Sequence, residues 1–176
     1  MRARRSCIGG QTEFVHLPNC AIPVDHYAVN MPRIRAANAA DRMEQVRMRV
    51  ALWPDADPAD LASELEDWSA TDDQVTFVVE RETGGLCGFV EAGVRPFANG
   101  VDEQPCAFVE GWYVDEDVRR TGVGRALIAA VEAWARSRGF TELGSDTEIW
   151  NEPSQQAHQA LGFEERERVV YFRKRL

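Results

Sequence analysis

Hydrophobic and polar residues alternate with different periods along this chain, and each period predicts one kind of element. Two segments rich in β-branched and aromatic residues, 74–81 and 86–94, flank Glu-Thr-Gly-Gly, which is typical of a hairpin turn. Similar runs predict further strands over 33–36, 106–114, 141–145 and 164–174. Apolar residues at helical spacing predict a helix from a cap at Asn38 or Asp41 to about Leu52, and others over 59–70, 123–138 and 152–161.

The order of these elements predicts the fold class. It reads strand, two helices, three strands, helix, strand, helix and strand. This order is typical of an α/β layered (α+β) fold, in which helices flank a mixed central sheet with a largely antiparallel first half.

Residues 1–30 differ from the rest of the chain. They begin with a basic Met-Arg-Ala-Arg-Arg, but no apolar core follows, so they make a poor signal peptide. Pro18 and Pro23 interrupt any periodicity. We interpret 1–30 as an upstream extension, a start-site choice or a flexible arm, with Met31 as the natural start. Residues 31–176 are predicted to form one domain with a core of its own.

Charge and cysteine content narrow the partners. A net charge of −9 argues against nucleic acid and anionic membranes and suits a small cationic substrate. No apolar run reaches the length of a membrane span. The four cysteines lie far apart, without a Cys-x-x-Cys pair or histidines at zinc-ligand spacing. We therefore expect no metal, and we expect a reducing, cytoplasmic location.

The stretch from Cys106 to Gly139 carries the strongest chemical signal. It predicts a strand, then Arg-Arg-Thr-Gly-Val-Gly at 119–124, then a helix. The glycines permit a tight turn and a close approach by a ligand, and the helix N-terminus with two arginines favours an anion. We interpret the turn as a pyrophosphate site. The alternative is an ordinary strand-to-helix turn with two solvated arginines. The spacing fits neither a P-loop nor the dinucleotide fingerprint.

Two carboxylates lie where a pocket is expected. Glu110 interrupts an otherwise apolar strand, and Asp146 follows the strand at 141–145. Sites of α/β sheets gather at strand ends, which favours a functional role for Asp146. The alternatives are a solvent-facing or amide-capping Glu110 and a turn- or helix-capping Asp146.

The Arg-x-x-Gly-x-Gly pattern after a strand ending in valine resembles the acyl-coenzyme A loop of the GNAT family of N-acetyltransferases. The resemblance implies the GNAT acyltransferase fold with splayed central strands, and acetyl-CoA as co-substrate. It also implies that the strand binds pantetheine and the loop binds phosphates. The residues so implied are Trp112, Tyr113, Val114, Arg119, Arg120, Thr121, Gly122, Val123, Gly124 and Arg125.

A second GNAT-like block begins at Asn151 and ends at Gly162-Phe163. In the family the asparagine contacts coenzyme A; the alternative is a loop residue or helix cap. His158 stands where most relatives carry the tyrosine that is credited with protonating the thiolate. Either His158 takes that role or it is a partly buried packing residue.

Further motifs resemble the aminoglycoside 6'-N-acetyltransferases of the resistance type. They are Leu52-Trp53-Pro54, Asn99-Gly100, the segments 108–114 and 144–147, and the block from His158 to Lys174. The resemblance implies acetyl transfer to the 6'-amine of kanamycin- or tobramycin-like drugs and a homodimer.

By the same resemblance the drug site comprises Trp53, Phe97, Glu110, Asp146 and Glu167. Trp53 would wall the sugar site, and Glu167 would meet a more distant amine, within one subunit or across a dimer interface. The alternatives are a core tryptophan and a solvated glutamate. Phe97 lacks the hydroxyl of the relatives' tyrosine, and Ala56 replaces a histidine found in several of them.

We expect direct attack of the amine on the thioester in a ternary complex. Backbone amides around Tyr113 and Val114 would polarise the carbonyl, and Asp146, or Glu110 through water, would take the amine proton. Two alternatives stay open. One is a GNAT enzyme for a polyamine, a peptide N-terminus or a metabolite amine, and the other is a non-catalytic acyl-CoA sensor.

Overall fold

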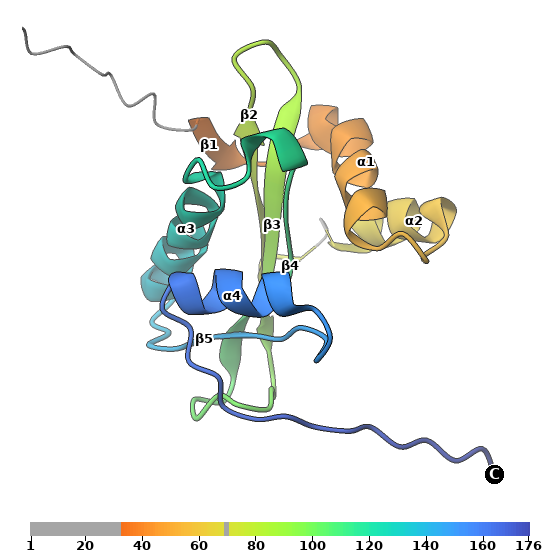
Figure 1. Ribbon diagram of the computed structural model, residues 1–176, viewed down its shortest axis with the longest axis vertical. Coiled ribbons are helices and arrows are strands. Elements are labelled where there is room, and N and C mark those ends of the chain that lie inside the picture. The colour runs from red at the N-terminus through yellow and green to blue at the C-terminus, as the bar shows by residue number, and fades with distance from the viewer. Residues whose placement is uncertain (1–32, 69–70) are drawn as a thin grey trace, which may run out of the picture. The chain divides into compact units, whose positions relative to one another are not determined.

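The computed structural model describes residues 33–68 and 71–176 (Figure 1). By its internal contacts the chain divides into Met1–Asn30 and a compact unit, Met31–Leu176. The predicted extension over 1–30 and the proposed start at Met31 lie outside the described residues.

Within the described residues, five strands form one sheet in the order β1-β2-β3-β4-β5. Strands β1 to β4 pair antiparallel, and β5 pairs parallel with β4. This arrangement confirms the mixed sheet with an antiparallel first half. The strands are β1 (Arg33–Ala36), β2 (Gln74–Glu80), β3 (Leu86–Arg95), β4 (Cys106–Val114) and β5 (Leu143–Ser145).

Helices cover both faces of the sheet, with α1 and α2 on one side and α3 on the other (Figure 1). The alternation of side chains along a strand explains why both faces are apolar. Val78 packs in the cluster with Met48 of α1, whereas its neighbour Val79 packs in the cluster with Leu127 of α3. The helical segments are η1 (Ala39–Asp41), α1 (Arg42–Leu52), α2 (Pro58–Trp68), η2 (Glu116–Val118), α3 (Val123–Ser137) and α4 (Glu152–Ala160).

The sheet forks between β4 and β5. The two strands pair over three residues, from Ala107–Leu143 to Val109–Ser145, and β4 then continues to Val114. A bulge lies at the fork: Glu91 of β3 faces Gly111, and the next residue of β3 faces Val109. Glu110 is therefore the extra residue in β4, which turns its side chain away from the regular alternation.

The predicted final strand over 164–174 is wrong, because this segment has no regular secondary structure. Its sequence is rich in valine and aromatic residues, but a strand also needs a neighbouring strand for its backbone hydrogen bonds. Among the described residues the segment pairs with no strand, and Val170, Tyr171 and Phe172 are 76–93% exposed. We call residues 164–176 the C-terminal tail.

Candidate active site

The loop between η2 and α3 has the backbone conformation that its glycines predict. Gly122, the N-cap of α3, has a φ of 96°, and Arg120 has a φ of 64°. The hydroxyl of Thr121 donates to the carbonyl of Val118 at 2.7 Å and closes the turn. The first amides of a helix have no acceptor within it, so the start of α3 presents N–H groups and a positive dipole end to a ligand.

The arginines around this loop are exposed, and two of them also support the fold. Arg119 donates through Nε to the carbonyl of Val114 at 3.0 Å, which ties the loop to the end of β4. Arg125 donates to the carbonyl of Ala160 at 3.1 Å, which joins α3 to the end of α4. Their guanidinium groups thus have fixed anchor points beside the N-terminus of α3.

Trp112 joins β4 to both helices of this side. A Cβ atom added at Gly124 would lie 2.6 Å from Cζ2 of Trp112, so only glycine permits this approach. The indole also meets the ring of His158 edge to face at a centroid distance of 5.7 Å. Its buried Nε1 has no hydrogen-bond partner within the described part of the chain.

His158 is held at both nitrogens. Nδ1 lies 2.8 Å from the carbonyl oxygen of Ser154, and Nε2 lies 2.9 Å from Oγ of Ser145. Because a carbonyl only accepts, Nδ1 carries a hydrogen, and the contact of Nε2 with the Ser145 hydroxyl joins α4 to the end of β5. The packing interpretation fits these contacts. The sequence did not predict the contact of Ser145 with His158. The position of Ser145 at the end of the predicted strand, next to Asp146, is the feature that could have indicated it.

Asn151 is the N-cap of α4. Its Oδ1 accepts a hydrogen bond from the backbone N–H of Ser154 at 3.2 Å. The helix-cap alternative therefore describes its contact in this structure.

Glu110 forms an ion pair with Arg95 at the fork, and the charge of Asp146 acts on the same arginine without a direct bond among the described residues. Arg95 donates through Nε to Oε1 of Glu110 at 2.7 Å and through Nη2 to the other carboxylate oxygen. The hydrogen bond to Glu110 raises the pKa of Arg95, and the charge of Asp146 adds a smaller contribution. The guanidinium also lies 3.6 Å from the ring centroid of Phe108. The periodicity gave no signal for Arg95, because its partners come from other strands.

Trp53 lies against β4 beside Glu110. A Cβ atom at Gly111 would lie 2.8 Å from Cη2 of the indole, so glycine permits this close contact. The guanidinium of Arg49 lies 5.2 Å from the indole centroid. Trp53 is half-buried, so it packs on the strand and still exposes part of its ring.

Beside Arg49, which contacts Trp53, lies a buried carboxylate, Glu91, which is 1% exposed. Its Oε1 lies 3.5 Å from Nη1 of Arg49. Burial raises the pKa of Glu91 to about 7, and the charge of Arg49 opposes this shift. The sequence places Glu91 inside a strand but gives no sign of its partner.

Phe97 and Glu167 are not brought into this cluster. Phe97 is exposed in the connection after β3, and Glu167 lies in the exposed C-terminal tail. The neighbouring Arg166 pairs with Asp102 at 3.2 Å.

Cys87 and Cys106 are buried, and burial raises the pKa of each thiol. They are therefore poor nucleophiles. Over 33–68 and 71–176, no group of three or more His, Cys, Asp or Glu side chains is arranged to hold a metal ion. No helix in these ranges is long and apolar enough to cross a membrane.

Comparison with known proteins adds a family to this geometry. The model of the acetyltransferase (GNAT) family matches residues 41–163. An aminoglycoside N(6')-acetyltransferase type 1 from Stenotrophomonas maltophilia is 44% identical over 143 residues, which cover 81% of this chain and 92% of that protein. One from Serratia marcescens is 42% identical over 130 residues, covering 73% and 89%.

Two solved structures have the same fold. AAC(6')-Iy, in complex with the bisubstrate analogue CoA-S-monomethyl-acetylneamine, is 37% identical with a TM-score of 0.77, covering 82% of this chain and 98% of that one. Apo AAC(6')-IG from Acinetobacter haemolyticus is 32% identical with a TM-score of 0.78, covering 82% and 99%.

Proposed function

This chain belongs to the acetyltransferase (GNAT) family, and we propose that it transfers acetyl from acetyl-CoA to the 6'-amine of kanamycin- or tobramycin-type aminoglycosides. The observation that carries the proposal is the ion pair of Glu110 with Arg95 at the fork of the sheet, on the strand that leads into the glycine loop. Asp146 follows β5 at the same fork, and its charge acts on the same arginine. The relatives named as 6'-acetyltransferases at 42–44% identity support the choice of substrate.

We propose that the coenzyme lies along the half of β4 that has no neighbour on the β5 side, and that it ends on the loop. Trp112, Tyr113 and Val114 would contact the pantetheine arm, and the amides from Gly122 to Arg125 would bind the pyrophosphate. Arg119 and Arg120 supply exposed positive charge beside these amides. No chemistry in this proposal needs a metal.

The strand geometry supports Val114 as the residue that makes the oxyanion contact. The N–H of Asp115 donates to the carbonyl of Cys87 in β3 at 2.8 Å. Because successive amides of a strand point to opposite sides, the N–H of Val114 points to the fork and that of Tyr113 to β3. We therefore propose Val114 as the donor to the thioester carbonyl, which narrows the expectation from the sequence.

Asp146 is the better proton acceptor of the two carboxylates. Both oxygens of Glu110 accept from Arg95, whereas Asp146 is exposed at the end of β5. In the proposed reaction Asp146 takes the proton of the 6'-ammonium, and the amine nitrogen attacks the thioester carbon. The carbon–sulfur bond then breaks, and the second proton of the attacking nitrogen passes to the departing thiolate, so that the products are the neutral amide and coenzyme A as the thiol. Glu110 and the exposed side of Trp53 hold the drug.

We propose a homodimer that works in the cytoplasm. The exposed apolar side chains of the C-terminal tail have the pattern of a strand, and the tail pairs with no strand within 33–68 and 71–176, which supports pairing with a second copy. The buried free thiols of Cys87 and Cys106 agree with a reducing compartment.

The test is thiol release from acetyl-CoA with and without tobramycin or kanamycin B. We expect saturable, drug-dependent release and one acetyl group on the 6'-nitrogen. Release with polyamines or peptide amines but not with the drugs would contradict the substrate. Binding of CoA without acetyl transfer to any amine tested would favour the non-catalytic sensor.

Asp146→Asn should lower kcat by about 10²- to 10⁴-fold, the usual contribution of a general base. Glu110→Gln, the matched control, should act mainly on the KM for the drug. Full turnover by Asp146→Asn with an unchanged pH profile would show that another group is the base.

A further inference from the structure

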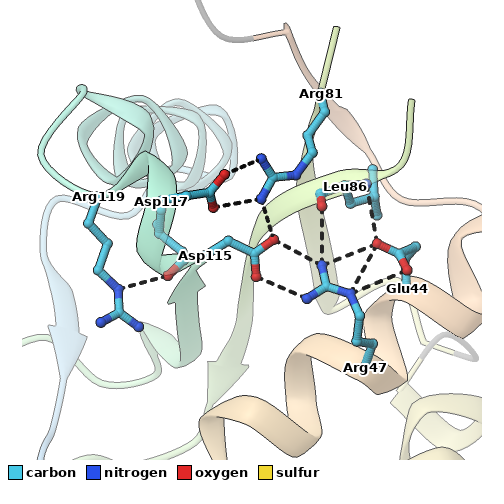
Figure 2. A network of polar contacts seen from close by, with 8 residues as sticks. Glu44, Arg47, Arg81, Leu86, Asp115, Asp117 and Arg119 are labelled. Carbon is cyan, nitrogen blue, oxygen red and sulfur yellow. Dashed lines mark hydrogen bonds and ion pairs between the residues drawn. The ribbon is translucent and has the colours of Figure 1, made fainter. Parts of the chain in front are cut away.

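A network of ion pairs surrounds Asp115, the first residue after β4 (Figure 2). Its carboxylate accepts hydrogen bonds from two arginines that lie in distant parts of the chain. Arg47 of α1 donates to Oδ1 at 2.9 Å and to Oδ2 at 3.1 Å, and Arg81, next after β2, donates to Oδ2 at 2.8 Å. Asp115 is 8% exposed, whereas the side chains of Arg47 and Arg81 are 42% and 26% exposed, so these bonds are partly shielded from water.

The same arginines bind further groups around this point (Figure 2). Arg81 donates to both carboxylate oxygens of Asp117 in η2, at 2.7 and 2.8 Å. Arg47 also donates to the carbonyl of Leu86 at 3.1 Å and pairs with Glu44. The segment from Asp115 to Asp117 is thereby tied to α1, to the end of β2 and to the start of β3.

The arginines of this network neutralise Asp115 and hold the backbone around it, so their positive charge is not directed to an external anion. Burial alone would raise the pKa of Asp115, but the hydrogen bonds from Arg47 and then Arg81 hold it below its usual value. The aspartate is thus a carboxylate at neutral pH, and the charges of the arginines are directed to it. The backbone N–H of Asp115 is fixed as well, by its bond to Cys87.

This segment is the junction between the two halves of the proposed coenzyme site. Val114, the proposed oxyanion donor, lies immediately before it, and the glycine loop begins a few residues after it. Arg119 of the loop donates back to the carbonyl of Val114 at 3.0 Å. A change in the path of the chain at Asp115 would therefore move the strand and the loop relative to each other.

We propose that Asp115 is a positioning residue for acetyl-CoA, and that the Arg47–Asp115–Arg81 network holds the junction of β4 and the loop in the conformation that accepts the pyrophosphate. The inference rests on the coenzyme site proposed above. It assigns a role in coenzyme affinity to three residues that need not touch the coenzyme.

The test compares Asp115→Asn with a matched control, Asp41→Asn. Asp41 is 7% exposed and is also held by two bonds from an arginine, Arg35, at 2.6 and 2.8 Å. It lies in η1 and is bonded to Arg35 instead of Arg47 or Arg81. The dissociation constant of CoA is measured by calorimetry, without any drug, and the KM for acetyl-CoA by thiol release.

We expect Asp115→Asn to raise the Kd of CoA and the KM for acetyl-CoA about tenfold, while kcat at saturation changes by less than about twofold. Asp41→Asn should leave both constants within about twofold of the wild type, even if it unfolds at lower urea. The effect of Asp115→Asn on S-acetylpantetheine, which lacks the pyrophosphate, should be clearly smaller.

The sign of the change separates positioning from simple electrostatics. Asp115→Asn removes a negative charge near the phosphates, so charge alone predicts tighter CoA binding. An unchanged or lower Kd, or an equal effect of Asp41→Asn, would overturn the proposal. So would an equal loss with S-acetylpantetheine.

Arg81→Gln provides a second test if Asp115→Asn does not fold, because Arg47 still holds the carboxylate. It should raise the Kd of CoA several-fold, and Arg81→Lys should restore part of the affinity. An unchanged Kd in Arg81→Gln would also overturn the proposal. A wild type that binds CoA but acetylates no aminoglycoside would contradict only the substrate, whereas one that binds no CoA would overturn the coenzyme site and this inference together.

Discussion

In the buried pair of Glu91 and Arg49, the attraction between the two charges compensates only part of the cost of burying Glu91. Their closest charged atoms are 3.5 Å apart, and neither Oε1 of Glu91 nor Nη1 of Arg49 has a hydrogen-bond partner among the described residues. The charge of Arg49 therefore offsets less than burial costs, and the pKa of Glu91 rises to about 7. Arg49 also contacts the indole of Trp53, so this incompletely compensated pair lies next to the proposed drug site.

This pKa predicts a pH-dependent stability. In the unfolded chain Glu91 ionises near 4.5, but in the folded protein it keeps its proton to about 7. The unfolded state therefore releases a proton first, and Glu91 lowers the free energy of unfolding as the pH rises from about 4.5 to 7. In urea unfolding, the stability of the wild type relative to Glu91→Gln should fall by about 1–3 kcal/mol across this window.

Asp41→Asn is the control for this measurement. The hydrogen bond from Arg35 lowers the pKa of Asp41, so its stabilising contribution is lost only as the pH falls below about 4. The difference between the wild type and Asp41→Asn should be flat from pH 5 to 8. A flat difference for Glu91→Gln as well would show that Glu91 is not a titrating buried carboxyl.

At the scale of elements, each predicted strand with a partner in the chain was confirmed, and the one without a partner was wrong. The hairpin turn joins β2 and β3 as predicted, because both strands and the turn are close in sequence. The C-terminal tail has equally good strand formers but no strand beside it among the described residues. Propensity records how well side chains fit a sheet and does not supply the hydrogen-bonding neighbour.

The tail therefore predicts an association that two charged substitutions together can break. Val170 and Phe172 would share one face of a strand, and both are exposed in one chain. We expect sedimentation velocity to show a dimer for the wild type and a monomer for the double variant Val170→Asp, Phe172→Asp. The apolar area lost at each residue and the buried charge both oppose association.

Met43→Asp is the matched control, since Met43 is an equally exposed apolar residue on α1, 85% exposed. This variant should remain a dimer. A wild type that sediments as a monomer at micromolar concentration would contradict the proposed homodimer.

At the scale of the whole molecule, the proposed site lies entirely within Met31–Leu176. Residues 1–30 contain three arginines and two acids, so the acidic character belongs to the remaining chain. A protein that begins at Met31 should keep kcat/KM for acetyl-CoA and the drug within about twofold, and its Tm within a few degrees. Thiol-release kinetics and calorimetry check both. A loss of tenfold or more in kcat/KM would place part of the site in residues 1–30.

The sequence by itself determined the features that depend on neighbours along the chain. Apolar spacing marked the core face of α3, turn residues marked the hairpin, and glycines with arginines marked the loop after β4. These signals fixed the layered fold class, and their combination was similar enough to one family for the comparisons to agree.

Only the tertiary structure decided which charged side chains meet. Arg47 and Asp115 are 68 residues apart in the chain, and Arg95 reaches Glu110 because β3 and β4 pair with a bulge between them. Periodicity describes the faces of one element, whereas an ion pair depends on the register and packing of two. The number of ways to pair twenty basic with twenty-nine acidic residues is large, and folding the backbone selects among them.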